Sequence, residues 1–445
     1  MRSVFALILT VAVGHVAVAQ EVLWPGFRGG PAAGVVQGTT HPLTWRLVGG
    51  DREGNRQNVA WIADVPGLAW SSPVVVDDTV YVTTAVTPDQ PAPRRFGGGG
   101  GAGSVRPTKP AEFRVIAYSL GDGGERWSTT VARLTPDQPT HPANSFATES
   151  PTTDGRFVFV HFGHAGVLAA LTLDGDVVWR RELGTYRFSS DFGTGSSIAY
   201  HDGVVVVHSD NNESAFIAGF DAETGDELWR TPRDRGSAWA SPLVVPGASG
   251  AQVIVPGRGH VTSYEPKSGE QIWKATGIRG GFSASPSVGD GHVYVGNSSR
   301  SGTGPLLALR LDARGEYVVD PADDRVRWLA ASQGFEHTSA VVVGNTIYAA
   351  RDAFFAAHDI RTGERLYRVR LPDGGIVVAS AWAVGDTVFV LNESGQTYAI
   401  AAGGEFRLLA TNMIDGDLFS ATPSVARGTL LIRGGDKLYA IREDD

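Results

Sequence analysis

Short β-branched runs, separated by tight polar turns, recur along most of this chain. Residues 195–209 read GSSIAYHDGVVVVHS, in which Asp202 and Gly203 separate two apolar runs. Residues 285–297 read SPSVGDGHVYVGN and repeat this form. Asp-Gly between alternating apolar runs is typical of a two-residue hairpin, because both positions tolerate a positive φ. The pattern therefore predicts pairs of short antiparallel strands.

Each predicted hairpin is followed by a third apolar run and then by a turn with a fixed form. This turn reads DAETGDELW at 221–229, EPKSGEQIW at 265–273 and DIRTGERLY at 359–367, and TLDGDVVW at 172–179 is a looser copy. The aromatic residues that end the turn or stand in its place are Trp127, Trp179, Trp229, Trp273, Trp328, Tyr367 and Phe406. A large ring on the last strand of each unit predicts packing between neighbouring sheets.

A pair of residues headed by a hydroxyl side chain, called a marker here, precedes each unit. The markers are Ser72-Pro73, Ser150-Pro151, Ser197-Ile198, Ser241-Pro242, Ser285-Pro286, Ser339-Ala340, Ser380-Ala381 and Thr422-Pro423. Apart from a first step of 78, the steps between them run from 41 to 54 residues. Four short strands repeated at this period are typical of a propeller blade, whereas a β-sandwich would not explain eight regular markers. We therefore predict an all-β, eight-bladed β-propeller with four antiparallel strands per blade.

The two ends of the chain predict how this ring closes. The last unit ends in KLYAIRED (437–444) and lacks the strand with the aromatic residue. The segment NVAWIADVPG (58–67) precedes the first marker and carries Trp61, so we expect it to complete the last blade and remove a bare strand edge. This assigns 58–445 to one propeller domain and 20–57 to an irregular strap along its outside.

The first residues predict export. Residues 1–19 hold an early Arg2, an apolar run and a small-x-small ending at Ala19, which is typical of a secretory signal peptide. The alternative is an uncleaved anchor helix, but the run is short for a membrane span and is interrupted by Gly14 and His15. We expect a periplasmic or secreted protein with no membrane span after cleavage.

Charge and cysteine content limit the function classes. The formal net charge is −9, whereas nucleic-acid binding needs a basic footprint, so we expect no nucleic-acid partner. The chain has no cysteine, which excludes disulfides, thiolate metal sites and a cysteine nucleophile. We expect a monomer that is stable through its core alone.

The repeated Asp-x-x-Thr-Gly-x-x-x-Trp turns and the segment WPGFRGGPAAG (24–34) resemble the pyrroloquinoline-quinone-like (PQQ-like) propeller family. Within it, the chain is similar to bacterial PQQ-binding-like β-propeller repeat proteins over nearly all of its mature length. The resemblance implies the fold. It implies no single function, because the superfamily holds quinoprotein alcohol dehydrogenases as well as an outer-membrane assembly lipoprotein that acts as a scaffold.

The longest loops are expected on one face of the ring. They include 85–112, with a glycine run at 97–101 that reads as a flap or spacer, and 132–147; the widened connection 314–326 is an exception. The turns and strand starts on this face should line a central funnel. The candidate ligand-binding residues are His141, Asn144, Glu149, His164, Asp191, Asp210, Arg233, Arg258, Arg279, Asn297, His337, Arg351 and Arg433. Several arginines favour an anionic ligand, unless they pair with nearby carboxylates and seal the channel.

We therefore expect a non-catalytic binding or scaffold module at the cell envelope that takes an envelope protein or a small anionic ligand. One alternative is a PQQ-dependent oxidoreductase of reduced size. It would hold PQQ with calcium through carboxylate and amide oxygens, and Asn144, Glu149, Asp191 and Asp210 carry such atoms. These residues match no dehydrogenase motif position by position, so no catalytic, cofactor or metal role is assigned to them.

A second alternative is a binder of carbohydrate or of cell-wall fragments. It would use aromatic side chains near the funnel such as Phe188, Trp239 and Phe282. His161 and His164 in HFGHAG have a spacing that metal sites use, but a histidine on an inner strand of a sheet is more often part of the core.

Overall fold

Antiparallel strands dominate the computed structural model, which describes residues 21–30, 34–38, 41–50, 54–89, 94–96, 103–247, 250–299, 302–335 and 337–443. The expected signal peptide and the glycine run 97–101 lie outside these ranges. The described ranges contain one short 3₁₀ turn, η2 (Ser189–Asp191), and none of their helices has the length and apolar character that crossing a membrane requires. The prediction of an all-β protein is confirmed.

Eight sheets follow one another along the described chain, and they are numbered here from 1 to 8. Sheet 1 holds β1 (Val22–Trp24), β6 (Val74–Val76), β7 (Thr79–Val86), β8 (Ala111–Ser119) and β9 (Glu125–Leu134). Sheet 2 holds β10 (Thr152–Thr153), β11 (Phe157–Phe162), β12 (Val167–Thr172) and β13 (Val177–Glu182). Sheet 3 holds β14 (Ala199–His201), β15 (Val204–Ser209), β16 (Phe216–Asp221) and β17 (Glu227–Pro232). Sheet 4 holds β18 (Leu243–Val245), β19 (Gln252–Gly257), β20 (His260–Tyr264), β21 (Gln271–Thr276) and β25 (Gly315–Val318).

The other four sheets follow the same plan. Sheet 5 holds β22 (Ser287–Gly289), β23 (His292–Ser299), β24 (Gly302–Arg310) and β26 (Val326–Ala330). Sheet 6 holds β27 (Val341–Val343), β28 (Thr346–Arg351), β29 (Phe354–Asp359) and β30 (Arg365–Arg370). Sheet 7 holds β2 (Val35–Val36), β31 (Trp382–Val384), β32 (Thr387–Leu391), β33 (Gln396–Ala401), β34 (Leu408–Ile414), β3 (Arg46–Leu47) and β4 (Arg56–Gln57). Sheet 8 holds β35 (Ser424–Ala426), β36 (Thr429–Arg433), β37 (Lys437–Ile441) and β5 (Val59–Asp64).

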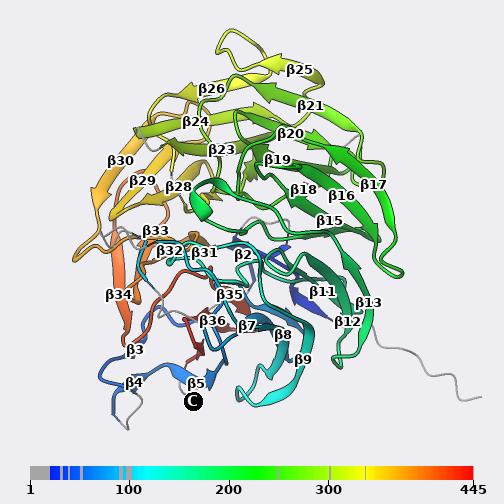
Figure 1. Ribbon diagram of the computed structural model, residues 1–445. Coiled ribbons are helices and arrows are strands. Elements are labelled where there is room, and N and C mark those ends of the chain that lie inside the picture. The colour runs from blue at the N-terminus through cyan, green and yellow to red at the C-terminus, as the bar shows by residue number, and fades with distance from the viewer. Residues whose placement is uncertain are drawn as a thin grey trace, which may run out of the picture.

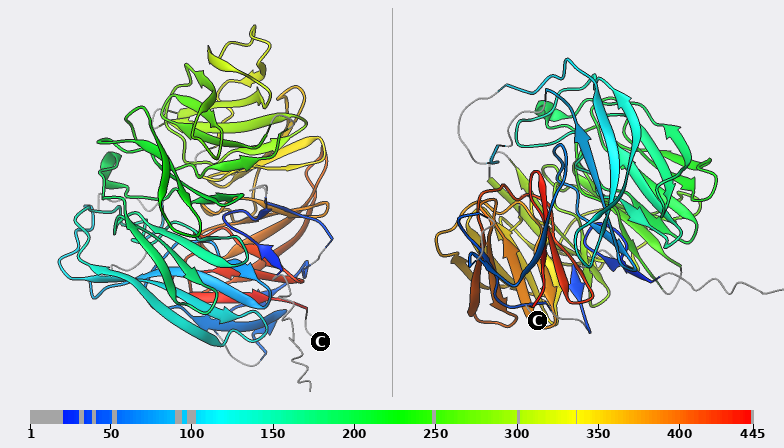
Figure 2. Two further views of the ribbon diagram at one scale, coloured as in Figure 1. Left: turned by 90° about the vertical axis from the view of Figure 1, so that its right-hand side faces the viewer. Right: turned by 90° about the horizontal axis from the view of Figure 1, so that it is seen from below.

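The sheets are arranged around the molecule in chain order, so that its blue and red ends lie side by side (Figures 1 and 2). The segment around Trp61 supplies β5, which pairs antiparallel with β37 and sets Trp61 opposite Ala440. The expected pairing of this segment with the last strands is confirmed. The widened connection at 314–326 supplies β25, which adds a parallel strand to the outer edge of β21.

The repeated turn and its aromatic residue make one contact between neighbouring sheets. Trp179 packs on Gly225 of the next turn, where φ is +74° and a Cβ would lie 2.5 Å from the indole ring. The Trp179 Nε1–H also donates to the Ala222 carbonyl at 2.9 Å. The same stacking recurs in the pairs Trp61–Gly123, Trp127–Gly175, Trp229–Gly269 and Trp328–Gly363. The turn therefore needs glycine both for its backbone and for the flat surface that receives the ring.

The hydroxyl residues that head the markers form a chain of hydrogen bonds at the inner ends of the sheets. Each of the first seven donates its backbone N–H to the side-chain oxygen of the next, over 2.8–3.0 Å, from Ser72 to Thr422. The last link is different, because Ser72 Oγ has no hydrogen-bond partner among the described residues. The markers therefore connect neighbouring sheets, and each marker hydroxyl from Ser150 to Thr422 accepts a buried N–H.

The position expected for the N-terminal strap is wrong for residues 22–30 and 34–36. β1 pairs with β6, an innermost strand, and the Pro25 carbonyl accepts the Thr153 N–H at 2.9 Å. Arg28 is buried and donates to the carbonyls of Pro286, at 3.0 Å, and of Ala340. β2 then adds a parallel strand to β31 in sheet 7. The strap crosses the inner ends of the sheets because its apolar rings and the Arg28 donors find partners there.

Only the later part of the strap lies on the outer side, as expected. There β3 pairs in parallel with β34, the outermost of the four consecutive strands of sheet 7, and β4 pairs with β3.

Arg28 lacks a water shell in its buried position, and this burial lowers its pKa to about 9.

Candidate functional site

A central cavity of about 620 Å³ lies between the inner ends of the sheets. Its walls come from the connections that lead into the innermost strands, from the turn between β19 and β20, and from Phe96 in the connection between β7 and β8. Phe27 of the strap also lines it. The strap contacts Thr152 and Thr153, just beyond the marker Ser150, whereas the loop residues come before the markers. Phe27 therefore closes one end, and the loops surround the other.

Two tiers of residues line this cavity, and within each connection their members stand two positions apart. The lower tier consists of the marker hydroxyls of Ser150, Ser197, Ser241, Ser285, Ser339, Ser380 and Thr422. The upper tier consists of the residues two positions before each marker, which are Trp70, Thr148, Gly195, Trp239, Ser283, His337, Val378 and Ser420. Alternate residues of an extended segment face the same side, so both tiers point inward.

Aromatic side chains form the upper part of the wall. The Trp70 Nε1–H donates to the Ala143 carbonyl at 3.1 Å, and the Trp239 Nε1–H donates to the Gly193 carbonyl at 2.8 Å. These bonds fix both indole rings. Phe96 crosses from sheet 1, and its ring centroid lies 4.5 Å from that of His337. The cavity mouth thus carries rings of fixed orientation.

The Phe96 ring is held through its own backbone. The Phe96 N–H donates to Glu393 Oε1 at 2.9 Å, across the mouth in sheet 7. Burial raises the pKa of Glu393, and the Phe96 N–H acts against this rise. The Phe96 ring also lies parallel to that of Phe192, with centroids 6.3 Å apart.

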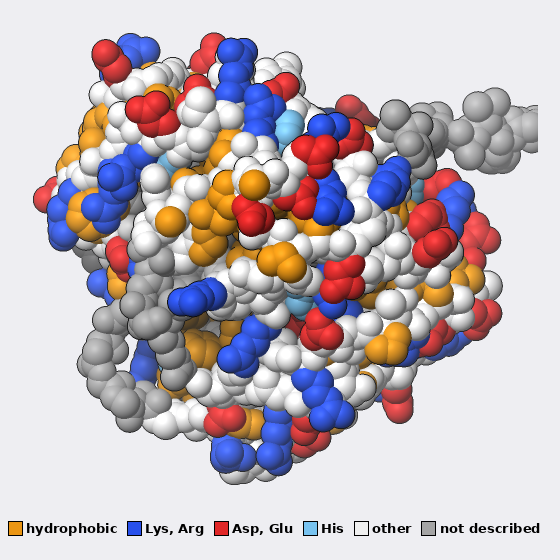
Figure 3. All heavy atoms as spheres, turned by 90° about the horizontal axis from the view of Figure 1, so that it is seen from above, with side chains coloured by type: hydrophobic (Ala, Val, Ile, Leu, Met, Phe, Trp, Pro, Cys, Tyr) orange, Lys and Arg blue, Asp and Glu red, His pale blue; other side chains and the backbone are white. Residues whose placement is uncertain are grey.

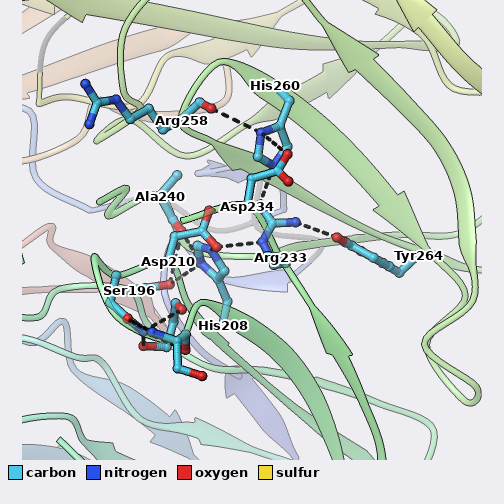
Figure 4. A network of polar contacts seen from close by, with 12 residues as sticks. Ser196, His208, Asp210, Arg233, Asp234, Ala240, Arg258, His260 and Tyr264 are labelled. Atoms are coloured by element: carbon cyan, nitrogen blue, oxygen red, sulfur yellow. Dashed lines mark hydrogen bonds and ion pairs between the residues drawn. The ribbon is translucent and has the colours of Figure 1, made fainter. Parts of the chain in front are cut away.

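Arg258 is the one cation on the described cavity lining. It stands in the turn between β19 and β20 and is exposed. Its guanidinium contacts no partner among the described residues, whereas its carbonyl lies 3.2 Å from His260 Nδ1 (Figure 4). Gly236 has φ +140° and leaves room for the Arg258 stem, since a Cβ there would lie 2.6 Å from Cδ. Arg258 therefore offers a free guanidinium on a stem held against the backbone.

A buried ion pair lies beneath Arg258. Arg233 donates to both carboxylate oxygens of Asp210, at 2.6 and 2.9 Å, and to the Tyr264 hydroxyl at 2.6 Å (Figure 4). Burial alone would raise the pKa of Asp210, but Arg233 and His208 hold it well below its usual range. Burial would lower the pKa of Arg233, but Asp210 and Tyr264 raise it above its usual range. Neither residue lines the cavity, and their charges compensate each other.

The same cluster brings a serine, a histidine and an aspartate together. Ser196 Oγ lies 3.0 Å from His208 Nδ1, and His208 Nε2 lies 3.1 Å from Asp210 (Figure 4). Ser196 is buried, its hydroxyl donates to the Ala240 carbonyl at 3.0 Å, and it does not line the cavity. A nucleophile needs access to its substrate, so this trio stabilises the contact between sheets 3 and 4.

A second buried cluster lies behind the wall at Thr194. The Thr194 hydroxyl lies 3.1 Å from His164 Nδ1 and hydrogen-bonds the carboxyl of Glu149, whose Oε1 accepts the Gly163 N–H at 3.3 Å. Burial raises the pKa of Glu149 to about 7 and lowers the pKa of His164 to about 4. The Glu149 Oε2 and the His164 Nε2 have no partner among the described residues. Only Thr194 of this cluster lines the cavity.

Of the candidates from the sequence, three line the cavity, namely Asn144, Arg258 and His337. Asn144 is committed to backbone, because its Nδ2 donates to the Phe192 carbonyl at 2.7 Å and to the Thr194 carbonyl at 2.9 Å. His141 stacks on Phe192 at the mouth, with ring centroids 4.6 Å apart.

The other candidates lie away from the cavity wall. Asp191 accepts the Ser104 hydroxyl at 2.6 Å, and Arg351 lies 3.8 Å from the Asp352 carboxylate. Arg279 is exposed, and its carbonyl accepts a bond from the buried Asn297.

Arg433 is fully buried and donates to Ser71 Oγ, at 3.0 Å, and to the Thr83 carbonyl, at 2.6 Å. Burial lowers its pKa to about 10. The expected arginines therefore do not converge on one mouth, where Arg258 alone is present among the described lining.

Of the three aromatic residues suggested for sugar binding, the structure places one in the cavity. Trp239 lines it, whereas Phe188 and Phe282 are buried and do not. Sequence reasoning missed Trp70, Phe96 and Phe192. Trp70 carried a signal, because it stands two positions before a marker just as Trp239 does.

The lining does not fit calcium-bound PQQ. No described lining residue has a carboxylate, and no three His, Cys, Asp or Glu side chains in the described ranges are placed to hold a metal ion. Glu149 and Asp210 lie behind the wall and already have partners. Calcium needs about six to eight oxygen ligands that usually include carboxylates, and the described lining supplies none of the latter.

A second cavity of about 630 Å³ lies between sheets 4 and 5. Its arginines are already engaged, since Arg310 pairs with Asp312 at 2.6 Å and Arg327 with Asp290 at 3.0 Å. The surface seen from above the view of Figure 1 carries Lys and Arg side chains mixed with Asp and Glu (Figure 3). The central cavity is therefore the stronger candidate site.

A protein-family model matches this chain in sequence, and solved structures match its fold. A family model described as outer membrane protein assembly factor BamB matches residues 111–301 and 257–445. No curated protein matches the sequence. The crystal structure of BamB from Moraxella catarrhalis is similar, with 16% identity, a TM-score of 0.54, and 81% of this chain and 98% of that chain covered.

Two solved structures of dehydrogenases are also similar. A europium-containing methanol dehydrogenase has 12% identity and a TM-score of 0.58, over 91% of this chain and 88% of that chain. The quinohemoprotein alcohol dehydrogenase ADHIIG from Pseudomonas putida HK5 has 12% identity and a TM-score of 0.55, over 87% of this chain and 76% of that chain. At these identities the likeness concerns the fold alone.

Proposed function

The chain belongs to the PQQ-like β-propeller family, and we propose that it is a non-catalytic binding or scaffold module of the cell envelope. Its working face is the mouth of the central cavity. The ligand or partner is an envelope protein or a small anionic molecule that meets the loops around this mouth.

The proposal also covers the number of blades and the closure of the ring. Residues 58–445 form one domain in which the eight sheets are eight blades of a closed propeller, and β5 completes the last blade. The chain of marker hydrogen bonds and the pairing of β5 with β37 support this. Residues 1–19 are removed on export, and the mature protein acts as a monomer in the periplasm or outside the cell.

The chemistry of the cavity lining carries the proposal. It offers hydroxyls, fixed aromatic rings and one guanidinium without a partner among the described residues, and these are groups that bind ligands. The acids that proton transfer would need are held elsewhere, because Asp210 is paired with Arg233 and Glu149 lies behind Thr194. A rim that binds without a reacting group suits a scaffold.

Site-specific cross-linking in the producing cells tests the proposal. A photo-reactive residue in place of Ser190, which is exposed on the rim, should give one discrete adduct. The control is the same residue in place of Val318, which is 64% exposed on the outer strand β25 and should give none. Equal adducts at both positions, or no adduct at Ser190 in a protein that also binds no small anion, would overturn the proposal.

A reaction assay separates the oxidoreductase alternative. Purified protein with PQQ and calcium should show neither a stoichiometric bound chromophore nor alcohol-dependent reduction of a dye. Tight quinone binding with turnover would replace the scaffold by a dehydrogenase.

A further inference from the structure

We propose that the central cavity binds an acidic saccharide, with its carboxylate held by Arg258 and the marker hydroxyls and its ring against Trp239. This inference rests on the proposed binding function and names the ligand class. It follows from three features of the cavity, which are its hydrogen-bond donors, its charge and its aromatic wall.

The lower tier presents hydrogen-bond donors to the cavity. Each marker hydroxyl, from Ser150 to Thr422, already accepts a backbone N–H through one lone pair. Its proton remains available, because among the described residues none of the seven donates to a protein acceptor. Seven hydroxyl protons around one space favour a ligand rich in acceptors, and a carboxylate oxygen is the strongest common acceptor.

The charges near the cavity favour an anion. Arg258 lies on the lining without a described partner, and no described lining residue is acidic. Arg433 is buried behind Trp70, since it donates to the adjacent Ser71, and its Nε and Nη2 have no partner among the described residues. The Asp210 charge does not offset these cations because Arg233 neutralises it. A guanidinium without a counter-ion attracts a carboxylate, and its planar fork can donate to both carboxylate oxygens.

The upper tier favours a sugar ring over a bare anion. Trp70 and Trp239 are held by bonds from their indole N–H groups, so their faces are preorganised at little entropic cost. The C–H face of a pyranose is apolar and packs on an aromatic ring, while its hydroxyls meet the Ser and Thr side chains of the lining. The volume of about 620 Å³ lies in the range of small-ligand sites.

Calorimetric titration of the purified protein tests this proposal, with glucuronate and galacturonate against glucose and galactose as neutral counterparts. At least one uronate should bind, more tightly than either neutral sugar, and its affinity should fall with added salt. Arg258→Gln should weaken the uronate about ten- to hundredfold. The matched control Arg279→Gln removes the same charge from an exposed site off the lining and should leave the affinity unchanged.

A second pair of variants tests the ring contact. Trp239→Leu should weaken the binding of both the uronate and the neutral sugars. The control is Trp127→Leu, which removes an indole that also donates one N–H bond but lies between sheets 1 and 2, and it should leave both affinities unchanged. Circular dichroism confirms that each variant is folded.

Four outcomes would overturn the proposal. These are no uronate binding at millimolar concentration, equal binding of neutral sugars, equal binding of inorganic sulfate, and PQQ as the only ligand. If Ser190 still cross-links specifically while the uronates fail, the binding module stands and only the ligand class is wrong.

Discussion

Replacing Glu149 by glutamine should make the protein more stable at pH 8 and leave it unchanged near pH 4.5. Burial raises the pKa of this carboxyl from 4.5 to about 7. Between these values the unfolded chain has released a proton that the folded protein keeps, so stability falls as the pH rises and levels off above pH 7. Each tenfold change in proton affinity corresponds to about 1.4 kcal/mol, so the buried charge costs about 3 kcal/mol at pH 8.

Glutamine copies the protonated form of Glu149. Its amide oxygen can still accept the Gly163 N–H and the Thr194 hydroxyl, and its NH₂ takes the place of Oε2, which has no described partner. Glu149→Gln should therefore raise the free energy of unfolding by up to about 3 kcal/mol at pH 8. The gain should disappear as the pH falls to 4.5, where both proteins are neutral at this position.

Urea unfolding followed by tryptophan fluorescence at pH 4.5, 6 and 8 measures this difference. The matched control is Glu223→Gln, whose carboxylate is 66% exposed beside Arg156 and should show no such rise with pH. A Glu149→Gln protein that is less stable than the wild type at pH 8 would refute the reasoning, because it would mean that the ionised carboxylate is stabilised.

Three further substitutions follow from packing and hydrogen bonding. Arg233→Met leaves the buried Asp210 without its main counter-ion and should lower the free energy of unfolding by about 3–5 kcal/mol in urea; a smaller loss would mean that the site is hydrated. Ser241→Ala leaves one buried marker N–H without its acceptor and should cost about 1–3 kcal/mol, measured in the same way, whereas no loss would show that the marker bonds are dispensable. Gly225→Ala forces a Cβ into Trp179 at positive φ and should lower the melting temperature in calorimetry, and an unchanged value would contradict the packing described.

The sequence predicts local features of this fold better than distant contacts. Asp202 and Asp290 adopt the positive φ that their hairpin turns require, because a turn depends on its own residues. Each marker also directly precedes the first strand of its four-strand unit, as the repeat predicted. The hydrogen bond from each marker to the next could not be predicted, since it joins residues 41 to 78 positions apart.

The site was less predictable than the fold. Arg233 and Arg258 look alike in the sequence, yet one is neutralised by Asp210 and the other faces the cavity. That difference depends on which side chain each strand turns inward and on partners from other strands. The rule that the residue two positions before each marker faces the cavity was available from strand geometry, and it would have identified Trp70.

The strap sets the order in which the molecule can be completed. Residues 22–30 and 34–36 are made before the sheets, yet they bind Thr153, Pro286, Ala340 and Ala383, and Ala383 lies more than 340 positions later. Contacts of such long range form slowly, because the entropy of closing the intervening chain is lost before the contacts can stabilise the fold. β1 can pair with β6 as soon as sheet 1 exists, whereas Arg28 and β2 cannot make their contacts until sheets 5 to 7 have formed, so a chain cut before those sheets would lack them.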